Sequence, residues 1–140
     1  MTRPAAALRR EVIRRAGNRC EYCLIHQDDA ASRHQVDHVI AEKHGGDTAL
    51  SNLALSCMLC NRRKASDIGS IDTQTGKFVQ FFDPRRQSWS ENFRLDGAQI
   101  NGITSEGRTT VEFLQLNSPE RVLERAPLIE VGRYKVGRGS

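Results

Sequence analysis

Four cysteines in two close pairs constrain this chain more than any other feature of its sequence. The pairs are Cys20-x-x-Cys23 and Cys57-x-x-Cys60. At this spacing one turn of backbone directs two sulfurs at one ion, and two such pairs make a four-thiolate tetrahedral zinc site. The ion would close residues 24–56 into a loop that presents side chains rigidly without a large core. The spacing therefore predicts one structural Zn²⁺ held by all four cysteines.

Disulfides and a redox pair are the alternatives for these cysteines. Disulfides form in oxidising compartments, and residues 1–10 contain no apolar segment of the kind found in export signals. A redox pair usually occurs singly, beside a βαβ pattern. We therefore expect zinc and a cytoplasmic location. No apolar run approaches the ~18 residues that a membrane span needs, so no membrane partner is expected.

The charge of the chain points to a polyanionic partner. Its 140 residues carry a formal net charge of +4, and the arginines are clustered. Clustered cations indicate phosphate contact more strongly than scattered ones, although a solvated basic face has the same pattern. We expect two clusters to contact nucleic acid: Arg9, Arg10, Arg14 and Arg15 near the N-terminus, and Arg62, Arg63 and Lys64 after the second cysteine pair.

The local sequence predicts helices and short strands in two regions. Residues 1–70 should hold an N-terminal helix and the metal segment, and residues 71–140 an α+β elaboration packed on it. In the first region we expect a helix over residues 4–16 that Gly17 ends, strands over 35–40 and 53–56, and a helix over 61–68. In the second we expect strands over 77–82, 89–95 and 98–104, a helix over 109–116, a helix starting at Ser118 that Pro127 kinks or ends, and a frayed tail over 137–140.

Polar residues inside the cysteine-bounded loop indicate chemistry. Asp37 and His38 are adjacent, so on a strand they point to opposite faces and divide the work. A carboxylate such as Asp37 suits Mg²⁺ or Mn²⁺, and an imidazole such as His38 can take a proton from water. The amide oxygen of Asn61 can complete the metal site, and Asn52 can fix the loop before the second strand. Each residue alone also has a structural explanation, as a surface Asp, a structural His or a capping Asn.

The order of these residues resembles the motif of the HNH endonucleases in its four-cysteine form. The resemblance covers residues 20–67 and rests on four matching segments: Asp37-His38, Gly45-Gly46, Leu50-Ser51-Asn52-Leu53 and Cys57-x-x-Cys60-Asn61-x-x-Lys64. The stretch from Phe82-Asp83-Pro84-Arg85 to Gly107-Arg108 also resembles a bacterial subgroup common in cyanobacteria. The resemblance implies an α+β chain with a ββα-metal (His-Me finger) core.

The resemblance also implies roles for individual residues. It implies that His38 is the general base, that Asn52 orients the base and its loop, and that Lys64 faces phosphate. Asn61 stands where the family often has His, which makes the chain an HNN variant with a metal ligand beside Asp37. The predicted activity is metal-dependent hydrolysis of phosphodiester bonds in DNA, expected to be double-stranded, with RNA left open. The alternative is a catalytically inactive zinc-knuckle module that binds nucleic acid or serves as an adaptor.

Overall fold

The computed structural model describes residues 3–134, and the chain divides into two compact units. The first unit comprises Met1–Ile68 together with Asp83–Arg85, and the second comprises Gly69–Phe82 together with Arg86–Ser140. Each unit contains both helices and strands, so the chain is α+β as its sequence predicts. The tail predicted over residues 137–140 lies outside the described residues.

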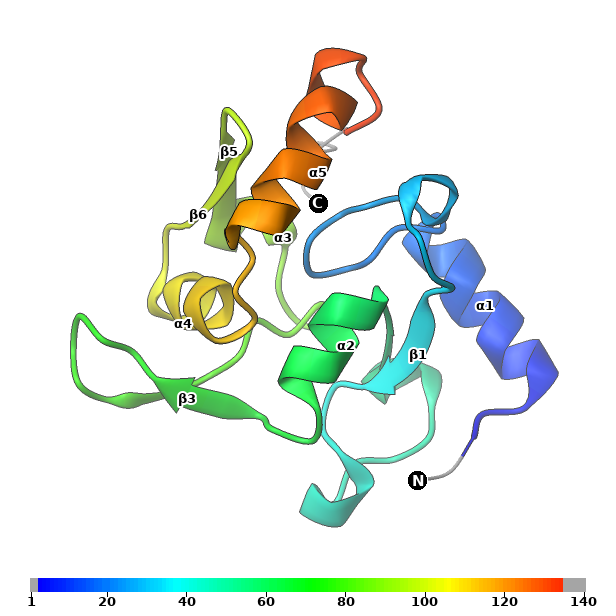
Figure 1. Ribbon diagram of the computed structural model, residues 1–140. Helices are drawn as coiled ribbons and strands as arrows, with labels where there is room; N and C mark the ends of the chain where they lie inside the picture. Colours follow the sequence, from blue (N-terminus) through cyan, green and yellow to red (C-terminus); the bar gives the residue numbers. More distant parts are fainter. Residues whose placement is uncertain (1–2, 135–140) are drawn as a thin grey trace. The chain divides into compact units, whose positions relative to one another are not determined.

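The first unit begins with helix α1 (Ala6–Ala16), shown in blue in Figure 1. Gly17 ends it in the left-handed conformation at φ 62°, and its N–H donates to Arg14 O at 3.1 Å. A residue with a Cβ adopts this conformation at a cost, which explains the glycine. The predicted helix and its C-terminal cap are confirmed.

An antiparallel hairpin follows, formed by β1 (Gln35–His38) and β2 (Leu53–Ser56). Helix α1 packs against this hairpin, beside β1 in Figure 1, and the small apolar core between them consists of Val12, Val36, Leu53 and Leu55. The second strand has its predicted bounds, whereas β1 stops at His38 instead of residue 40. It stops there because both backbone groups of Ile40 are bonded to the side chain of Asn52 instead of a partner strand.

Helix α2 (Met58–Lys64) completes a ββα arrangement with the hairpin. It begins three residues before the predicted start because Cys57 caps it: the Cys57 sulfur accepts the Cys60 N–H at 3.4 Å. It also ends before the predicted Ile68, because Ala65 leaves helical geometry with φ 48°. Three 3-10 turns lie in the connections of this unit: Gln27–Asp29, Glu42–His44 and Leu50–Asn52.

The second unit contains two further antiparallel hairpins and a short helix. The hairpins pair β3 (Gly69–Ile71) with β4 (Phe78–Gln80), and β5 (Phe93–Asp96) with β6 (Gln99–Gly102). The strand predicted over residues 89–95 is wrong in its first half, where α3 (Trp89–Asn92) forms instead. The side chain of Asn92 donates to Ser88 O at 2.9 Å and so closes this helical turn. Strand β3 has no counterpart among the predicted elements.

Two helices end the described chain, α4 (Ser105–Phe113) and α5 (Pro119–Glu130). Helix α4 begins before its predicted start because the Thr104 hydroxyl accepts the Gly107 N–H at 3.0 Å and caps it. Helix α5 starts at the predicted place, directly after Ser118, although the Ser118 side chain makes no capping hydrogen bond. Pro127 does not end it, because the helix continues to Glu130. Proline lacks one N–H donor, but its φ is close to the helical value. The helix therefore continues past Pro127 on its remaining hydrogen bonds.

Aromatic rings form the core of the second unit. Phe93 meets Phe82 edge to face and lies tilted against Trp89, each pair with ring centroids 5.0 Å apart. Such offset contacts add to the free energy gained from burying the rings. Among residues 3–134, no helix combines the length and the apolar composition needed to cross a membrane.

Candidate functional site

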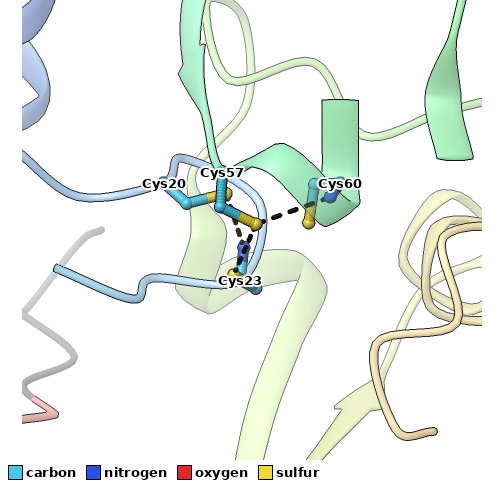
Figure 2. Close-up of side chains that lie close together, drawn as sticks. All are labelled: Cys20, Cys23, Cys57 and Cys60. Atoms are coloured by element: carbon cyan, nitrogen blue, oxygen red, sulfur yellow. Dashed lines mark hydrogen bonds between the residues drawn. The ribbon is translucent and has the colours of Figure 1, made fainter. Parts of the chain in front are cut away.

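The four cysteines of the first unit lie together, two in the turn after α1 and two at the start of α2. Cys20 and Cys23 come from the turn after α1, and Cys57 and Cys60 from the start of α2, with their sulfurs pointing toward one another (Figure 2). All four side chains are buried, and the four sulfurs lie within 4.8 Å of one another. A tetrahedral Zn²⁺ with bonds of about 2.3 Å holds its sulfurs roughly 3.8 Å apart. The Cys23 and Cys57 sulfurs are 3.7 Å apart.

The surroundings of the sulfurs fit a cation bound to thiolates. The backbone N–H groups of Tyr22 and Cys23 donate to the Cys20 sulfur, each at 3.4 Å, as Cys60 N–H does to Cys57. Burial raises the pKa of the Cys20 thiol well above its usual range. A bound cation reverses that preference, because metal ligation deprotonates a thiol. These four residues could therefore hold a metal ion such as zinc.

Asp37 of β1 is buried and faces a buried lysine. The Lys64 ammonium lies 3.1 Å from Asp37 Oδ2 and donates to His38 O at 3.0 Å. Only 5% of Asp37 and 1% of Lys64 is exposed, so neither side chain has bulk water as its partner. Burial raises the pKa of the Asp37 carboxyl, and the Lys64 charge opposes that rise. The Lys64 ammonium is thus the charged partner of Asp37 Oδ2.

Lys64 is buried, so its ammonium does not face a phosphate at the surface as the family resemblance implied. Its side chain does not lie on the helix surface either, which was the alternative. Helix α2 presents Lys64 toward β1, where the nearest charged group is Asp37. A buried ammonium needs a counter-charge and acceptors, and Asp37 Oδ2 and the His38 carbonyl provide them. The sequence spacing of Asp37 and Lys64 gives no sign of this pairing.

His38 is held in place by a residue that the sequence did not single out. The imidazole is 3% exposed, and its Nε2 lies 2.8 Å from the Thr48 hydroxyl oxygen. Thr48 follows the Gly45-Gly46-Asp47 turn, so the connection between the two strands supplies the partner. A threonine ten residues from a histidine has no spacing signal, because only the folded connection brings the two together.

Asn52 fixes that same connection through its side chain. Its amide donates to Ile40 O at 2.9 Å and to Asp47 O at 2.8 Å, while its Oδ1 accepts the Ile40 N–H at 2.9 Å. Gly46 allows this close approach, since a Cβ there would lie 1.7 Å from Ile40 O. Asn52 and Gly46 together hold the backbone that follows His38, which is the loop-fixing role expected of this asparagine.

Asp37 and His38 line one cavity of about 230 Å³ at the end of β1. Ala41, Glu42 and Lys43 form one side of it, and Ala65 and Ser66 after α2 form another. Asn61, the other predicted ligand of the catalytic ion, is half-buried in α2 and is not among the residues lining this cavity. The structure therefore brings Asp37 and His38 to a common cavity and does not place the Asn61 amide there.

Some of the arginines predicted to contact nucleic acid have partners within the first unit, and others do not. Arg14 pairs with Glu11 on the helix surface, and Arg15 donates to the backbone carbonyls of Leu50, at 2.8 Å, and Leu53. Arg15 therefore ties α1 to the start of β2, a structural contact. Arg9, which is half-buried, and Arg10, which is exposed, have no acidic partner among residues 3–134. Within the same residues, exposed Arg62 contacts only Met58 of its own helix.

Comparison with known proteins gives one family match and one relative. The family model of the HNH endonucleases matches residues 20–67. Septu protein PtuB of Bacillus thuringiensis is 24% identical over 120 residues, which are 84% of this chain and 44% of the relative, so the chain spans less than half of that protein. No solved structure matches significantly. The match covers the cysteine cluster, the hairpin and α2, and residues 20–67 are therefore a domain of the HNH endonuclease family.

Proposed function

We propose that this domain is a metal-dependent endonuclease that hydrolyses phosphodiester bonds in DNA. The observation that carries the proposal is the cavity at the end of β1, which both Asp37 and His38 line. The backbone that follows β1 is held by the hydrogen bonds between Asn52 and Ile40. A fixed carboxylate beside a fixed imidazole is the pair that phosphodiester hydrolysis requires: an oxygen ligand for a divalent ion and a base for water.

His38 acts as the general base in this proposal. Its Nε2 shares a hydrogen bond with the Thr48 hydroxyl in which either group can donate. In the tautomer with the proton on Nε2, Nδ1 keeps the lone pair that accepts a proton from the attacking water. Thr48 thereby fixes the orientation of the ring, and Asn52 keeps the backbone beside it in place. The attack is in line with the bond to the leaving oxygen.

Asp37 is the proposed first ligand of a catalytic Mg²⁺ or Mn²⁺. The family resemblance implies the Asn61 amide oxygen as the second ligand, and this amide would have to approach the ion from outside the cavity lining. The residues fit a hard cation because Asp37 offers a buried carboxylate oxygen, which would exchange its Lys64 partner for the ion. A divalent ion bound there supplies positive charge for the non-bridging and leaving oxygens of the phosphate. The cysteine site takes no part in the chemistry, because zinc with four thiolates has a closed coordination sphere.

The buried Lys64 ammonium favours a second candidate function. It neutralises Asp37 without any divalent ion, and a site neutralised in this way suits a module that binds nucleic acid and does not cut it. The two functions differ in whether Lys64 yields the carboxylate to an ion. The motif residues Asp37, His38, Asn52 and Asn61 together support the nuclease.

A nicking assay on supercoiled plasmid with Mg²⁺ or Mn²⁺ separates the two functions, with a folded RNA as a parallel substrate. We expect cleavage by the wild type and a loss of about 10²-fold or more in His38→Ala, the usual scale for a general base. His44→Ala is the matched control, because His44 is exposed and lies outside the cavity lining. Near-normal nicking by His38→Ala would remove His38 from the mechanism. Binding without any cleavage by the wild type would favour the second function.

A further inference from the structure

The first unit contains a second cavity, of about 320 Å³, that shares no lining residue with the one holding Asp37 and His38. It lies between α1 and the loop that leads into β1. Three arginines reach it, Arg9 and Arg10 from one side of the helix and Arg33 from the loop. No acidic residue lines it. The cavity therefore gathers three positive charges that nothing in its own wall neutralises.

These three arginines differ from their neighbours in having no ion pair with any residue among 3–134. Arg14 is one turn further along α1 and is paired with Glu11, and Arg15 is bonded to backbone carbonyls. Arg14 and Arg15 thus already have partners within the first unit. Arg9, Arg10 and Arg33 have no such partner among residues 3–134, and all three line one cavity.

The backbone that carries Arg33 is fixed by its two neighbours. Gln27 donates through Nε2 to Ser32 O at 3.0 Å and accepts the His34 N–H at 2.7 Å. The His34 ring is 3% exposed, and its Nε2 contacts Ile25 O at 3.0 Å. Arg33 therefore lies on a loop whose backbone is held by hydrogen bonds, and Arg9 and Arg10 lie on helix α1. Cations on fixed backbone lose less entropy when an anion binds.

The rest of the cavity favours an anion with an organic group attached. Ala6 and Ile13 of α1 and Leu55 of β2 contribute apolar wall, and the volume lies at the lower end of the range of ligand pockets. Guanidinium groups match phosphate oxygens in geometry. Three of them match a phosphate monoester, which carries nearly two negative charges at neutral pH, better than a backbone diester, which carries one.

We propose that this cavity binds the phosphate monoester of a nucleotide. Two sources present that chemistry, a free mononucleotide and the phosphorylated end of a nucleic-acid strand. Arg9, Arg10 and Arg33 hold the phosphate, and the sugar or base lies against the apolar wall. The assignment is separate from cleavage at Asp37 and His38, so a failure of the nuclease proposal leaves it standing.

Binding measured without added divalent ions tests this site, using the metal-loaded full chain. Calorimetry compares AMP with adenosine, and fluorescence anisotropy compares a 5′-phosphorylated oligonucleotide with its 5′-hydroxyl counterpart at fixed salt. We expect the phosphate to tighten binding by about tenfold or more in at least one comparison, the effect of about 1.4 kcal/mol. The comparison with the larger effect identifies the source. Equal binding with and without the terminal phosphate in both comparisons overturns the proposal.

Charge-removing variants then locate the site. Arg9→Gln and Arg33→Gln should abolish most of the preference for the phosphorylated ligand, because each removes a charge-assisted contact. Arg14→Gln is the matched control: it removes the same charge from the same helix outside the cavity, and the preference should change less than twofold. All three side chains lie at the surface, so unfolding curves should coincide. A preference that survives both cavity variants, or falls equally in Arg14→Gln, overturns the assignment.

Discussion

The interactions that stabilise the first unit internally differ in kind from those that stabilise the second. The first has a small apolar core on one face of its hairpin, and elsewhere depends on four buried cysteines, the Asn52 amide and a buried ion pair. The second is built around aromatic rings, with Phe93 in contact with both Phe82 and Trp89. Hydrogen bonds and metal–ligand bonds depend on direction, whereas the hydrophobic effect is non-directional. The unit with the directional contacts is also the one that holds the candidate catalytic cavity.

The largest expected effect follows from removing one thiolate. Cys57→Ser should lose the bound metal and unfold the first unit, because a structural zinc contributes about 10–16 kcal/mol. Trp89 is the single tryptophan of the chain and is buried in the second unit, so its fluorescence should keep its folded signature. Metal analysis and paired circular-dichroism and fluorescence melts check this. Full zinc content with an unchanged melt would refute it, and loss of both signals in one step would show that the two units unfold together.

The converse change is Phe93→Ala in the second unit. Phe93 is 1% exposed and packs against two rings, so truncation should cost about 3–5 kcal/mol. The Trp89 signal should melt earlier while the metal content stays at the wild-type level. Phe78→Ala is the control, because Phe78 is 61% exposed in the same unit. Metal loss in Phe93→Ala would contradict the contrast between the units.

Lys64→Met tests the buried ion pair of the first unit. Removing the ammonium leaves the Asp37 carboxylate buried without its counter-charge, which should cost about 3–5 kcal/mol. Added Mg²⁺ or Mn²⁺ should then raise the melting temperature of the variant more than that of the wild type, because an ion can take the place of the ammonium. The double variant Asp37→Asn/Lys64→Met should regain stability and lose the response to metal. An equal response in wild type and Lys64→Met would show that Asp37 does not receive the ion.

Thr48→Val should have the smallest effect, confined to the candidate site. The substitution keeps the shape and removes the hydroxyl beside His38 Nε2, so the ring loses its orienting partner. We expect nicking to fall about tenfold, the effect of about 1.4 kcal/mol, with zinc content and DNA binding unchanged. Thr73→Val, in the second unit, is the control for the loss of a threonine hydroxyl. Unchanged nicking in Thr48→Val would mean that His38 is oriented by its burial alone.

Local sequence patterns predicted the first unit better than the second. A glycine after a helical stripe and alternating β-branched residues predicted α1, its cap, β1 and β2 within two residues at each end. The errors in the second unit arise from side chains that override propensity. Asn92 turns a β-prone segment around Trp89 into α3, and Thr104 starts α4 early. Pro127, a helix breaker in sequence terms, is tolerated inside α5.

The sequence by itself determined the cysteine cluster, the hairpin that carries Asp37 and His38, and the family match, because these depend on short spacings along the chain. Only the tertiary structure decided what surrounds each charged group. It buried Lys64 against Asp37, placed Thr48 beside His38, bonded Arg15 to the carbonyls of Leu50 and Leu53, and brought Arg33 to Arg9 and Arg10. The physical reason is that a charge is stabilised by whichever partner packing brings within a few ångströms. Residues that are distant in sequence become partners only when the chain has folded.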